Sequence, residues 1–345
     1  MALRARDLRL YPASRWSGKV VLNMTEPARK AGMNPDSPVC VFAPSLYLTV
    51  TIEERDGCPE AGEVHLHPGG QGFWIARMLA ELGGNPVLCG PIGGEAGAVL
   101  EAIVPAWGVR LAPVWTKSAS PCRVTDRRGG ERAIVADGRL PLERHEADDL
   151  YDKVLELSLR HRCCVITGTD PNDLLPLVFF EHLGADLSEI EALVIADLHG
   201  DQLNGLLTHG ALSVLKVSDR DLIADGIIPD RSDASARKAI THFSDEAIEW
   251  LVVSRAEQGA LMAADGSIYR SQPPRLEVVD EIGAGDSMTA ALVVARLQGL
   301  RPQEALRLAC AAGTANITRH GLASAPAELI EQLTGEIGVE LVGSK

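Results

Sequence analysis

The sequence predicts an α/β fold: helices on both faces of a mostly parallel central sheet, with a small β-sheet lid inserted into it. Short, continuously apolar runs such as 39–43 and 163–167 alternate with segments of helical spacing, which is typical of parallel strands buried on both faces. The segments near 45–68 and 120–137 do not fit that rhythm, because they are rich in β-branched residues and turn signals. They predict the lid. A chain of 345 residues is long enough for one large α/β unit with an appendage.

The individual elements follow from periodicity and from the glycines and prolines that interrupt it. The predicted strands are 39–43, 46–53, 64–67, 87–89, 121–124, 132–136, 163–167, 193–197, 213–217, 251–254, 259–262, 267–270 and 276–280. The predicted helices are 73–82, 98–107, 144–159, 174–183, 234–243, 286–298 and 302–318. The sequence thus predicts one domain over 38–335, with an N-terminal extension at 1–37 and a C-terminal tail at 336–345.

The composition excludes several classes of protein. There are 47 Asp and Glu against 33 Lys and Arg, a formal charge of −14, which argues against a nucleic-acid partner. No run approaches the roughly 18 apolar residues of a membrane span, so we expect no membrane partner. The seven cysteines form no C-x-x-C pattern, and several lie in apolar runs. They are typical of buried thiols in a reducing compartment, so we expect a cytoplasmic location.

The first 30 residues differ in charge from the rest of the chain, with seven Lys and Arg against two acids. They contain no apolar stretch of the kind found in a secretory signal. We favour an arm that packs on the acidic body; the alternative is a transit peptide.

The most specific segment is the turn at 280–286. Gly283, Ala284 and Gly285 precede a helix predicted to begin at Asp286 or Ser287. Backbone N–H groups and the dipole at a helix N-terminus form an anion site. A carboxylate beside such a site is what phosphoryl transfer to a hydroxyl needs, because it can accept the hydroxyl proton. The alternative is a glycine turn in which Asp286 only caps the helix.

Other routes to nucleotide chemistry are poorly supported. The chain has no G-x-x-x-x-G-K-[ST] motif, and its first strand leads into Ala43-Pro44-Ser45 instead of a G-x-G-x-x-G turn. His65 and His67 share one face of a short strand but have no nearby third metal ligand, so we expect surface residues there.

Two long signatures carry a family resemblance. One is the run 68–84, PGGQGFWIARMLAELGG, followed by GPIGG at 90–94; the other is DEIGAGD at 280–286. With these motifs the chain resembles the ribokinase-like (PfkB) carbohydrate kinases over about residues 38–330, nearest the phosphosugar-kinase branch. The resemblance implies a ribokinase-like three-layer sandwich, a sugar-like substrate, ATP and Mg²⁺. It also implies a homodimer through the lid, which often forms the dimer interface in this family.

The resemblance also implies roles for particular residues. Asp286 is the expected base, with Gly283, Ala284 and Gly285 as the anion hole. The expected nucleotide residues are Lys216, Ser218, Asp221, Ser254, Gly259 and Asn316, with Asp221 also directed at magnesium. The expected substrate residues are Tyr47, Gly69, Gly70, Gln71, Trp74 and Arg123, and Arg77 is a further candidate for phosphate.

The departures from the family pattern gather where the sugar should bind. Tyr47 stands where the family has an Asp, and Gln71 and Trp74 stand where its phosphosugar branch has Lys and Asn. Ala256 replaces a glycine of the usual S-x-G-x-x-G, and Glu281 replaces a threonine. We therefore do not carry over fructose 1-phosphate or tagatose 6-phosphate as the substrate. The alternatives to a sugar kinase are a degenerate relative that binds nucleotide or metabolite without turnover, and a nucleoside kinase.

Overall fold

The computed structural model describes residues 37–55, 58–128, 130, 132–136, 141–169, 174–319 and 321–344. The N-terminal extension therefore lies outside the described residues, except for its last position. The strands are β1 (Pro38–Phe42), β2 (Tyr47–Arg55), β3 (Cys58–Gly69), β4 (Asn85–Ile92), β5 (Arg110–Trp115), β6 (Cys122–Asp126), β7 (Arg132–Ala136), β8 (Cys163–Thr167), β9 (Leu193–Asp197), β10 (Leu212–Ser218), β11 (Ile248–Ser254), β12 (Ala260–Ala264), β13 (Ser267–Gln272) and β14 (Gly338–Ser344).

The α-helices are α1 (Gln71–Glu81), α2 (Gly94–Ile103), α3 (Arg144–His161), α4 (Leu177–Glu189), α5 (Gly200–His209), α6 (Asp219–Ala224), α7 (Asp233–His242), α8 (Ala284–Gln298), α9 (Pro302–Ile317) and α10 (Ala327–Glu336). Short 3₁₀ turns cover η1 (Val104–Trp107) and η2 (Ala256–Gln258).

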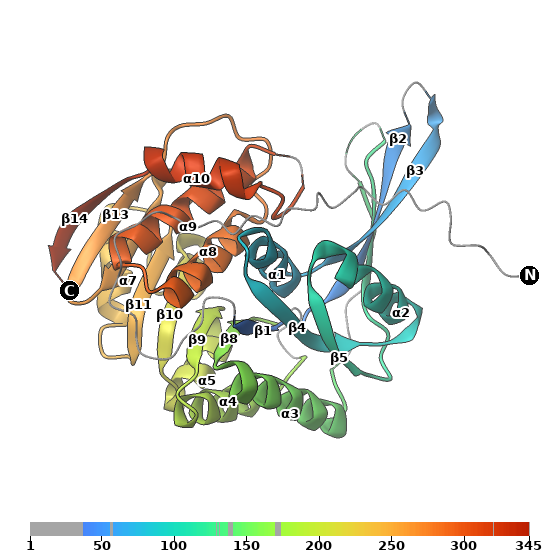
Figure 1. Cartoon of the computed structure of the whole chain (residues 1–345), viewed down its shortest axis with the longest axis horizontal. Coiled ribbons are helices and arrows are strands. Elements are labelled where there is room, and N and C mark those ends of the chain that lie inside the picture. Colours follow the sequence, from blue (N-terminus) through green and yellow to red (C-terminus); the bar gives the residue numbers. More distant parts are fainter. Residues whose placement is uncertain are drawn as a thin grey trace, which may run out of the picture.

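Ten strands form the central sheet, in the order β14-β13-β12-β11-β10-β9-β8-β1-β4-β5. The strands from β11 to β5 pair in parallel, whereas β12, β13 and β14 are joined by antiparallel ladders. Helices α8, α9 and α10 lie on one side of this sheet and α3, α4 and α5 on the other (Figure 1). Each side has its own buried apolar cluster. The predicted three-layer α/β architecture is confirmed.

The lid is a separate four-stranded sheet, in the order β3-β2-β6-β7. It projects from the body beyond α1 and α2 (Figure 1). Its β6–β7 ladder is antiparallel, as the glycines at 129–130 predict for a hairpin. The small inserted sheet is thus present where the sequence places it.

Three local expectations differ from the structure. The expected C-terminal tail forms β14, which pairs with β13 and extends the central sheet. The expected strand at 276–280 is not a strand: the backbone N–H groups of Val279 and Asp280 both donate to the carbonyl of Ile317 instead of to a strand. The helix expected at 98–107 is α2, followed from Val104 by the 3₁₀ turn that contains Pro105.

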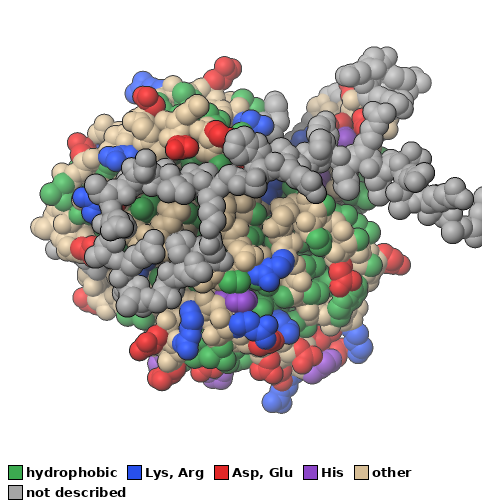
Figure 2. Space-filling model, viewed as in Figure 1, with side chains coloured by type: hydrophobic (Ala, Val, Ile, Leu, Met, Phe, Trp, Pro, Cys, Tyr) green, Lys and Arg blue, Asp and Glu red, His purple; other side chains and the backbone are tan. Residues whose placement is uncertain are grey.

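The parallel sheet brings together the carboxyl ends of β9, β10 and β11, and these ends carry polar residues: Asp197, Lys216 with Ser218, and Ser254. Ligands bind preferentially at this edge in open α/β sheets. On the part of the face in Figure 2 that is drawn in colour, both acidic and basic side chains are present. No helix within the described part of the chain is long and apolar enough to cross a membrane.

Candidate active site

The glycine turn at 283–285 begins α8. Gly283 is the N-cap residue with φ 82°, a left-handed conformation that glycine adopts without steric cost. The first-turn N–H groups, including those of Gly285 and Asp286, have no acceptor one turn earlier in the helix. They carry the positive end of the helix dipole, so the turn has the donors of an anion site.

Asp286 lies in this first turn and is partly exposed. Desolvation of the carboxylate by the surrounding protein raises the pKa of Asp286 to about 7. The negative charge of Asp197 contributes less to this rise, and the positive charge of Lys216 opposes it. A carboxylate with a pKa near neutrality can both take up and release a proton at physiological pH, as a general base must.

Asp197 connects this turn to the central sheet. Its carboxylate accepts hydrogen bonds from the Lys216 ammonium at 3.1 and 3.2 Å and from the Thr289 hydroxyl at 2.5 Å. Burial alone would lower the pKa of Lys216, but the nearby carboxylates of Asp197 and Asp286 raise it above its usual value. The ammonium therefore keeps its charge beside the anion site.

The position of Lys216 explains one glycine of the turn. A Cβ at Gly285 would lie 2.7 Å from Lys216 Nζ, so the ammonium lies directly against the Gly285 backbone. Only a glycine allows this approach without moving the lysine. The anion site therefore combines backbone donors with one fixed positive charge.

Asp197 and Thr289 were missed by the sequence analysis. Asp197 is 92 residues from Thr289, and no local motif marks either. The available signal is that Asp197 ends a continuously apolar strand, at the edge where parallel sheets place their functional groups.

Ser218 and Asp221 form the capping box of α6. The Ser218 hydroxyl donates to Asp221 Oδ2 at 2.6 Å and accepts from the Asp221 N–H at 3.1 Å. The other carboxylate oxygen of Asp221 lies 3.8 Å from His199 Nε2. Asp221 is thus held in place by hydrogen bonds and is partly exposed. It lies just after β10, the strand that carries Lys216.

The donor set fits a magnesium ion held mainly by phosphates. The described residues contain no group of three or more His, Cys, Asp or Glu side chains that could enclose a metal. Mg²⁺ in phosphoryl-transfer enzymes is usually held by one or two carboxylates, water and substrate phosphates. Asp221 has a carboxylate suited to that role, whereas Asp197 already binds Lys216 and Thr289.

Ser254 is the last residue of β11, and Gly259 directly precedes β12. Ser254 pairs with Ser218 of β10, so the two predicted nucleotide segments are neighbours. Gly259 has φ 77°, and a Cβ there would lie 2.5 Å from the Ser271 carbonyl oxygen. Ala256 adopts φ 46° without being a glycine. This segment is therefore a tight and strained turn.

Asn316 lies against the glycine turn at 283–285. Its side chain is 1% exposed; Nδ2 donates to the Ile282 carbonyl at 2.8 Å and Oδ1 accepts from the Ala323 N–H at 2.8 Å. The resemblance predicts a nucleotide contact for this residue. The structure shows its amide joining the backbone of Ile282, just before the turn, to the backbone of Ala323.

The expected acceptor residues meet at the N-terminus of α1. Gln71 donates to the backbone carbonyl of Asp197 at 3.1 Å, and a Cβ at Gly70 would lie 2.4 Å from the Ser45 carbonyl oxygen. A Cβ at Gly69 would lie 2.3 Å from the Tyr47 ring.

Tyr47 and Arg123 form one unit on the lid. The Arg123 guanidinium lies 4.1 Å from the centre of the Tyr47 ring, and its Nη1 donates to the Tyr47 hydroxyl at 3.2 Å. The stacking fixes a positive charge on the lid strand β6. Tyr47, which stands where the resemblance leads us to expect an Asp, is therefore accompanied by the cation of Arg123.

Trp74 lies in the core. It is 6% exposed and packs edge-on against Phe73, with ring centres 4.9 Å apart. Arg77 packs over the Trp107 ring at 4.3 Å and donates to the Leu322 carbonyl at 2.7 Å, so its guanidinium supports the fold.

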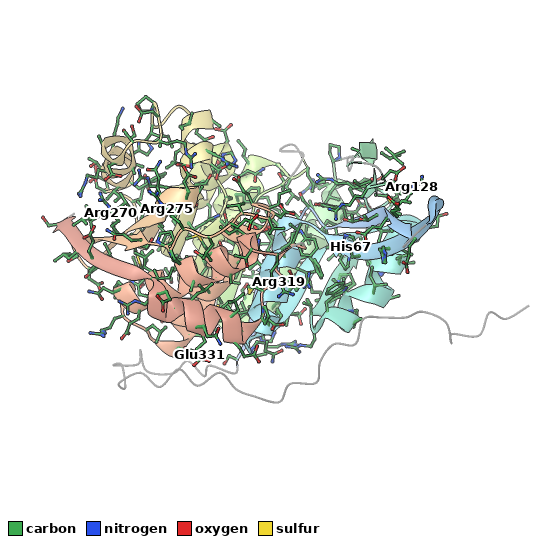
Figure 3. All side chains as sticks on the ribbon, turned by 90° about the horizontal axis from the view of Figure 1, so that it is seen from above. His67, Arg128, Arg270, Arg275, Arg319 and Glu331 are labelled. Atoms are coloured by element: carbon green, nitrogen blue, oxygen red, sulfur yellow. The ribbon has the colours of Figure 1, made fainter. Side chains whose placement is uncertain are left out.

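His65 and His67 lie on the lid, and neither is fully exposed. The His67 ring centre is 6.4 Å from that of Trp74, and burial, followed by the charges of Arg127, Arg77 and His65, lowers the pKa of His67 to about 4. Figure 3 shows His67 and Arg128 on the lid, with Arg270 and Arg275 at the opposite end of the molecule. His67 is thus a half-buried neutral group, unlike the surface residue that we predicted.

Comparison with known proteins places this site in context. The family model of the pfkB family carbohydrate kinases matches residues 45–328. An ATP-dependent 6-phosphofructokinase isozyme 2 of Mycobacterium tuberculosis is 25% identical over 320 residues, covering 90% of this chain and 92% of the relative. A 1-phosphofructokinase of Vibrio cholerae is 24% identical over 86% of this chain and 94% of its own length.

Solved structures agree on the fold. Phosphofructokinase-2 from Escherichia coli, in a crystal structure with potassium, superposes with a TM-score of 0.77 at 23% identity, over 87% of this chain and 99% of that one. A ribokinase of Arabidopsis thaliana with ribose and ATP superposes with a TM-score of 0.67 at 19% identity, over 87% and 99% of the two chains. The ribokinase-like fold is therefore confirmed, and the chain belongs to the pfkB family of carbohydrate kinases.

Proposed function

We propose that this carbohydrate kinase transfers the terminal phosphoryl group of ATP to a hydroxyl of a sugar phosphate, with Asp286 as the general base. The observation that carries the proposal is the position of Asp286 in the first turn of α8, with a pKa near 7 and a fixed ammonium nearby. The curated relatives named above are kinases of phosphorylated sugars. They support the substrate class but not a particular sugar.

In this mechanism Asp286 accepts the proton of the acceptor hydroxyl as the oxygen attacks the phosphorus. The N–H groups of the 283–286 turn and the Lys216 ammonium stabilise negative charge on the phosphoryl oxygens. Magnesium, when bound, would neutralise charge on the ATP phosphates, with Asp221 as the protein ligand. The Tyr47–Arg123 unit supplies a cation for the phosphate that the acceptor already carries.

A panel assay tests the proposal. Purified protein with ATP and magnesium is offered sugars, sugar phosphates and nucleosides, and ADP release is measured. We expect ADP only with one or more sugar phosphates. Release with a nucleoside alone would contradict the proposed acceptor class, and no release with any acceptor would favour the degenerate kinase that binds without turnover.

The geometry does not favour a nucleoside acceptor. Trp74 is packed in the core, and Arg123 covers one face of the Tyr47 ring. Trp74 therefore offers no open ring face to a base, and one face of Tyr47 is already occupied.

The pH dependence gives a direct test of the base. Below its pKa of about 7, Asp286 holds a proton and cannot accept another. We expect kcat to fall about tenfold per pH unit below pH 7 and to level off above it. The measurement is the initial rate from pH 5 to 9 at saturating substrates; a profile that is flat between pH 5 and 8 would contradict the assignment.

We also propose that two copies of the chain associate through the lid. Ladder partners place Leu66, Val50, Val124 and Val135 in one row across the four strands, on one face. Leu66 and Val135 are 48% and 46% exposed, and Val64 in the next row is 60% exposed. Such a contiguous apolar face is typical of an interaction surface.

Replacing Leu66 with Glu should convert the dimer into a monomer, because the carboxylate would be buried against an apolar partner surface. Light scattering after size-exclusion chromatography measures the mass. Leu341→Glu makes the same change at an exposed leucine on β14, away from the lid, and should leave the dimer intact. A wild-type protein of monomer mass at micromolar concentration would contradict the proposed dimer.

The expected cytoplasmic location stays a prediction.

A further inference from the structure

Two arginines hold each other's backbone: Arg255, which directly follows β11, and Arg231, which lies in the segment between α6 and α7. Arg255 Nη2 donates to the carbonyl of Arg231 at 3.0 Å, and Arg231 Nη2 donates to the carbonyl of Arg255 at 3.3 Å. Each also has its own carboxylate: Arg231 Nε donates to Asp219 at 2.7 Å, and Arg255 Nη1 donates to Asp233 at 2.6 Å. We call these four residues the arginine clasp.

The clasp connects the two segments proposed to bind the nucleotide. Asp219 directly follows Ser218 at the end of β10, and Arg255 directly follows Ser254 at the end of β11. Arg270, which also bonds Asp233, lies at the end of the molecule opposite the lid (Figure 3). The clasp is therefore on the nucleotide side of the site, away from the acceptor residues on the lid.

The residue after Arg255 is strained. Ala256 has φ 46°, in the left-handed region that a residue with a Cβ rarely adopts. The turn around it is closed by hydrogen bonds from the Arg255 N–H to the Gly259 carbonyl at 2.8 Å and from the Gln258 N–H to the Arg255 carbonyl at 3.0 Å. A strained residue persists only where its surroundings determine its conformation. For Ala256 the preceding residue, Arg255, is held in place by its side-chain hydrogen bonds.

The burial of Arg255 is hard to explain by stability alone. Its side chain is 2% exposed, yet its Nε finds no hydrogen-bond partner among the described residues. Buried ion pairs are weak contributors to stability, and an apolar residue of similar volume often replaces them without loss. Arg255 holds the pKa of Asp233 below its usual value, so the pair stays charged at neutral pH. The arrangement is suited to fixing the backbone conformation of the turn that follows Arg255.

We propose that the arginine clasp holds the strained 254–259 turn in the shape that binds ATP, and that Arg255 and Arg231 are positioning residues for the nucleotide. This inference rests on the proposed function, because it assumes that the ends of β10 and β11 form the nucleotide site. It adds the reason why this chain tolerates alanine at 256.

The test measures the dissociation constant of Mg-ADP by titration calorimetry, which needs no knowledge of the acceptor. Arg255→Met keeps most of the side-chain volume and removes the clasp, so we expect binding about tenfold weaker. In the same background Ala256→Gly relieves the strain and should restore about half of the lost binding free energy. Ala256→Gly alone is measured as the reference for the double variant, so that the recovery is counted against its own effect on the dissociation constant.

Arg296→Met is the matched control. Arg296 is a largely buried arginine, with 11% of its side chain exposed, and its Nε also has no partner among the described residues. It pairs with Glu249 and stacks on Trp250 at 4.3 Å. It lies in the last turn of α8, at the end away from Asp286. We expect its melting temperature to fall about as much as that of Arg255→Met, while its dissociation constant for Mg-ADP stays within about twofold of the wild-type value.

Three results would overturn the inference: wild-type affinity in Arg255→Met, equal weakening in Arg296→Met, or no recovery on adding Ala256→Gly. If Arg255→Met does not fold, Arg231→Lys replaces it, since it removes the Nη2 bond to Arg255 and should weaken Mg-ADP at least threefold, by about 0.7 kcal/mol. Wild-type protein that fails to bind Mg-ADP contradicts the proposed function itself. Wild-type protein that binds it, with unchanged affinity in the variants, contradicts only the clasp.

Discussion

Replacing Asp286 with Asn should lower kcat by about 10³-fold, because general-base catalysis typically contributes 10² to 10⁴. The amide has nearly the same shape as the carboxyl group but cannot take up the hydroxyl proton. The backbone donors of the 283–286 turn remain, so we expect the dissociation constant for Mg-ADP to change less than about twofold. Single-turnover rates and titration calorimetry on the same preparation separate the two effects.

The same substitution should change how stability depends on pH. The pKa of Asp286 is raised from 3.8 to about 7 on folding, so the folded protein binds the proton more readily than the unfolded chain. Its contribution to stability is present below pH 4 and is lost as the pH rises from 4 through 7. Asp286→Asn removes this loss, so its free energy of unfolding at pH 8 should exceed that of the wild-type protein in urea titrations.

Asp265→Asn is the control for both measurements. Asp265 is exposed in the β12–β13 turn at φ 51°, a conformation that asparagine also tolerates. We expect wild-type kcat and a wild-type pH dependence of stability. An Asp286→Asn protein that keeps more than about a tenth of wild-type kcat would mean that another group removes the proton.

The parts of the site that the sequence predicts are those encoded by neighbouring residues. The 283–286 turn needs only two glycines and an acid in succession, and its effect, a helix N-terminus with free donors, is local. The alternation of apolar runs with helical segments likewise predicts a parallel sheet, because strands buried on both faces have continuously apolar sequences.

The parts that sequence could not predict depend on contacts between distant segments. Lys216 meets Asp197 across 19 residues, and Asn316 meets Ile282 across 34. Single residue identities leave open whether such a side chain faces a ligand or the backbone. Trp74 shows the same limit, since its place in a substrate signature did not reveal that its ring packs in the core.

The errors in secondary structure have a similar origin. The run at 276–280 has the apolar composition of a strand, but none of the described strands pairs with it, and Val278 is left 50% exposed. The sequence predicts a tail at 336–345, where glycine and charged residues interrupt the apolar positions. This segment forms β14 because the edge of β13 offers unpaired backbone groups.

Replacing Lys216 with Met should damage both catalysis and stability. The ammonium is the only cation that hydrogen-bonds the 4% exposed Asp197 within the described part of the chain, and it also lowers the pKa of Asp286. Without it two neighbouring carboxyl groups remain, so we expect a loss of about 3–5 kcal/mol in unfolding free energy at pH 8. We expect kcat to fall by about 10²- to 10³-fold, because one stabilising charge beside the phosphoryl group is lost.

The pH dependence distinguishes this electrostatic explanation from simple misfolding. Removing Lys216 should raise the pKa of Asp286 further, so the loss of activity on acidification should begin at a higher pH than in the wild-type protein. The stability deficit should shrink from pH 8 to pH 6, because protonation of the carboxyl pair removes the unbalanced charge. Lys153→Met, which breaks a partly exposed pair with Glu156 on α3, should change neither profile.

A second substitution separates the effect of Lys216 on stability from its effect on catalysis. Adding Asp197→Asn to Lys216→Met removes the buried unpaired charge, so stability at pH 8 should return most of the way to the wild-type value while kcat stays low. Recovery of stability without recovery of turnover would show that Lys216 has two separable roles: it balances Asp197 in the fold and supplies charge at the anion site. If the double variant stays as unstable as the single one, the lysine acts through packing, and the charge-balance explanation is wrong.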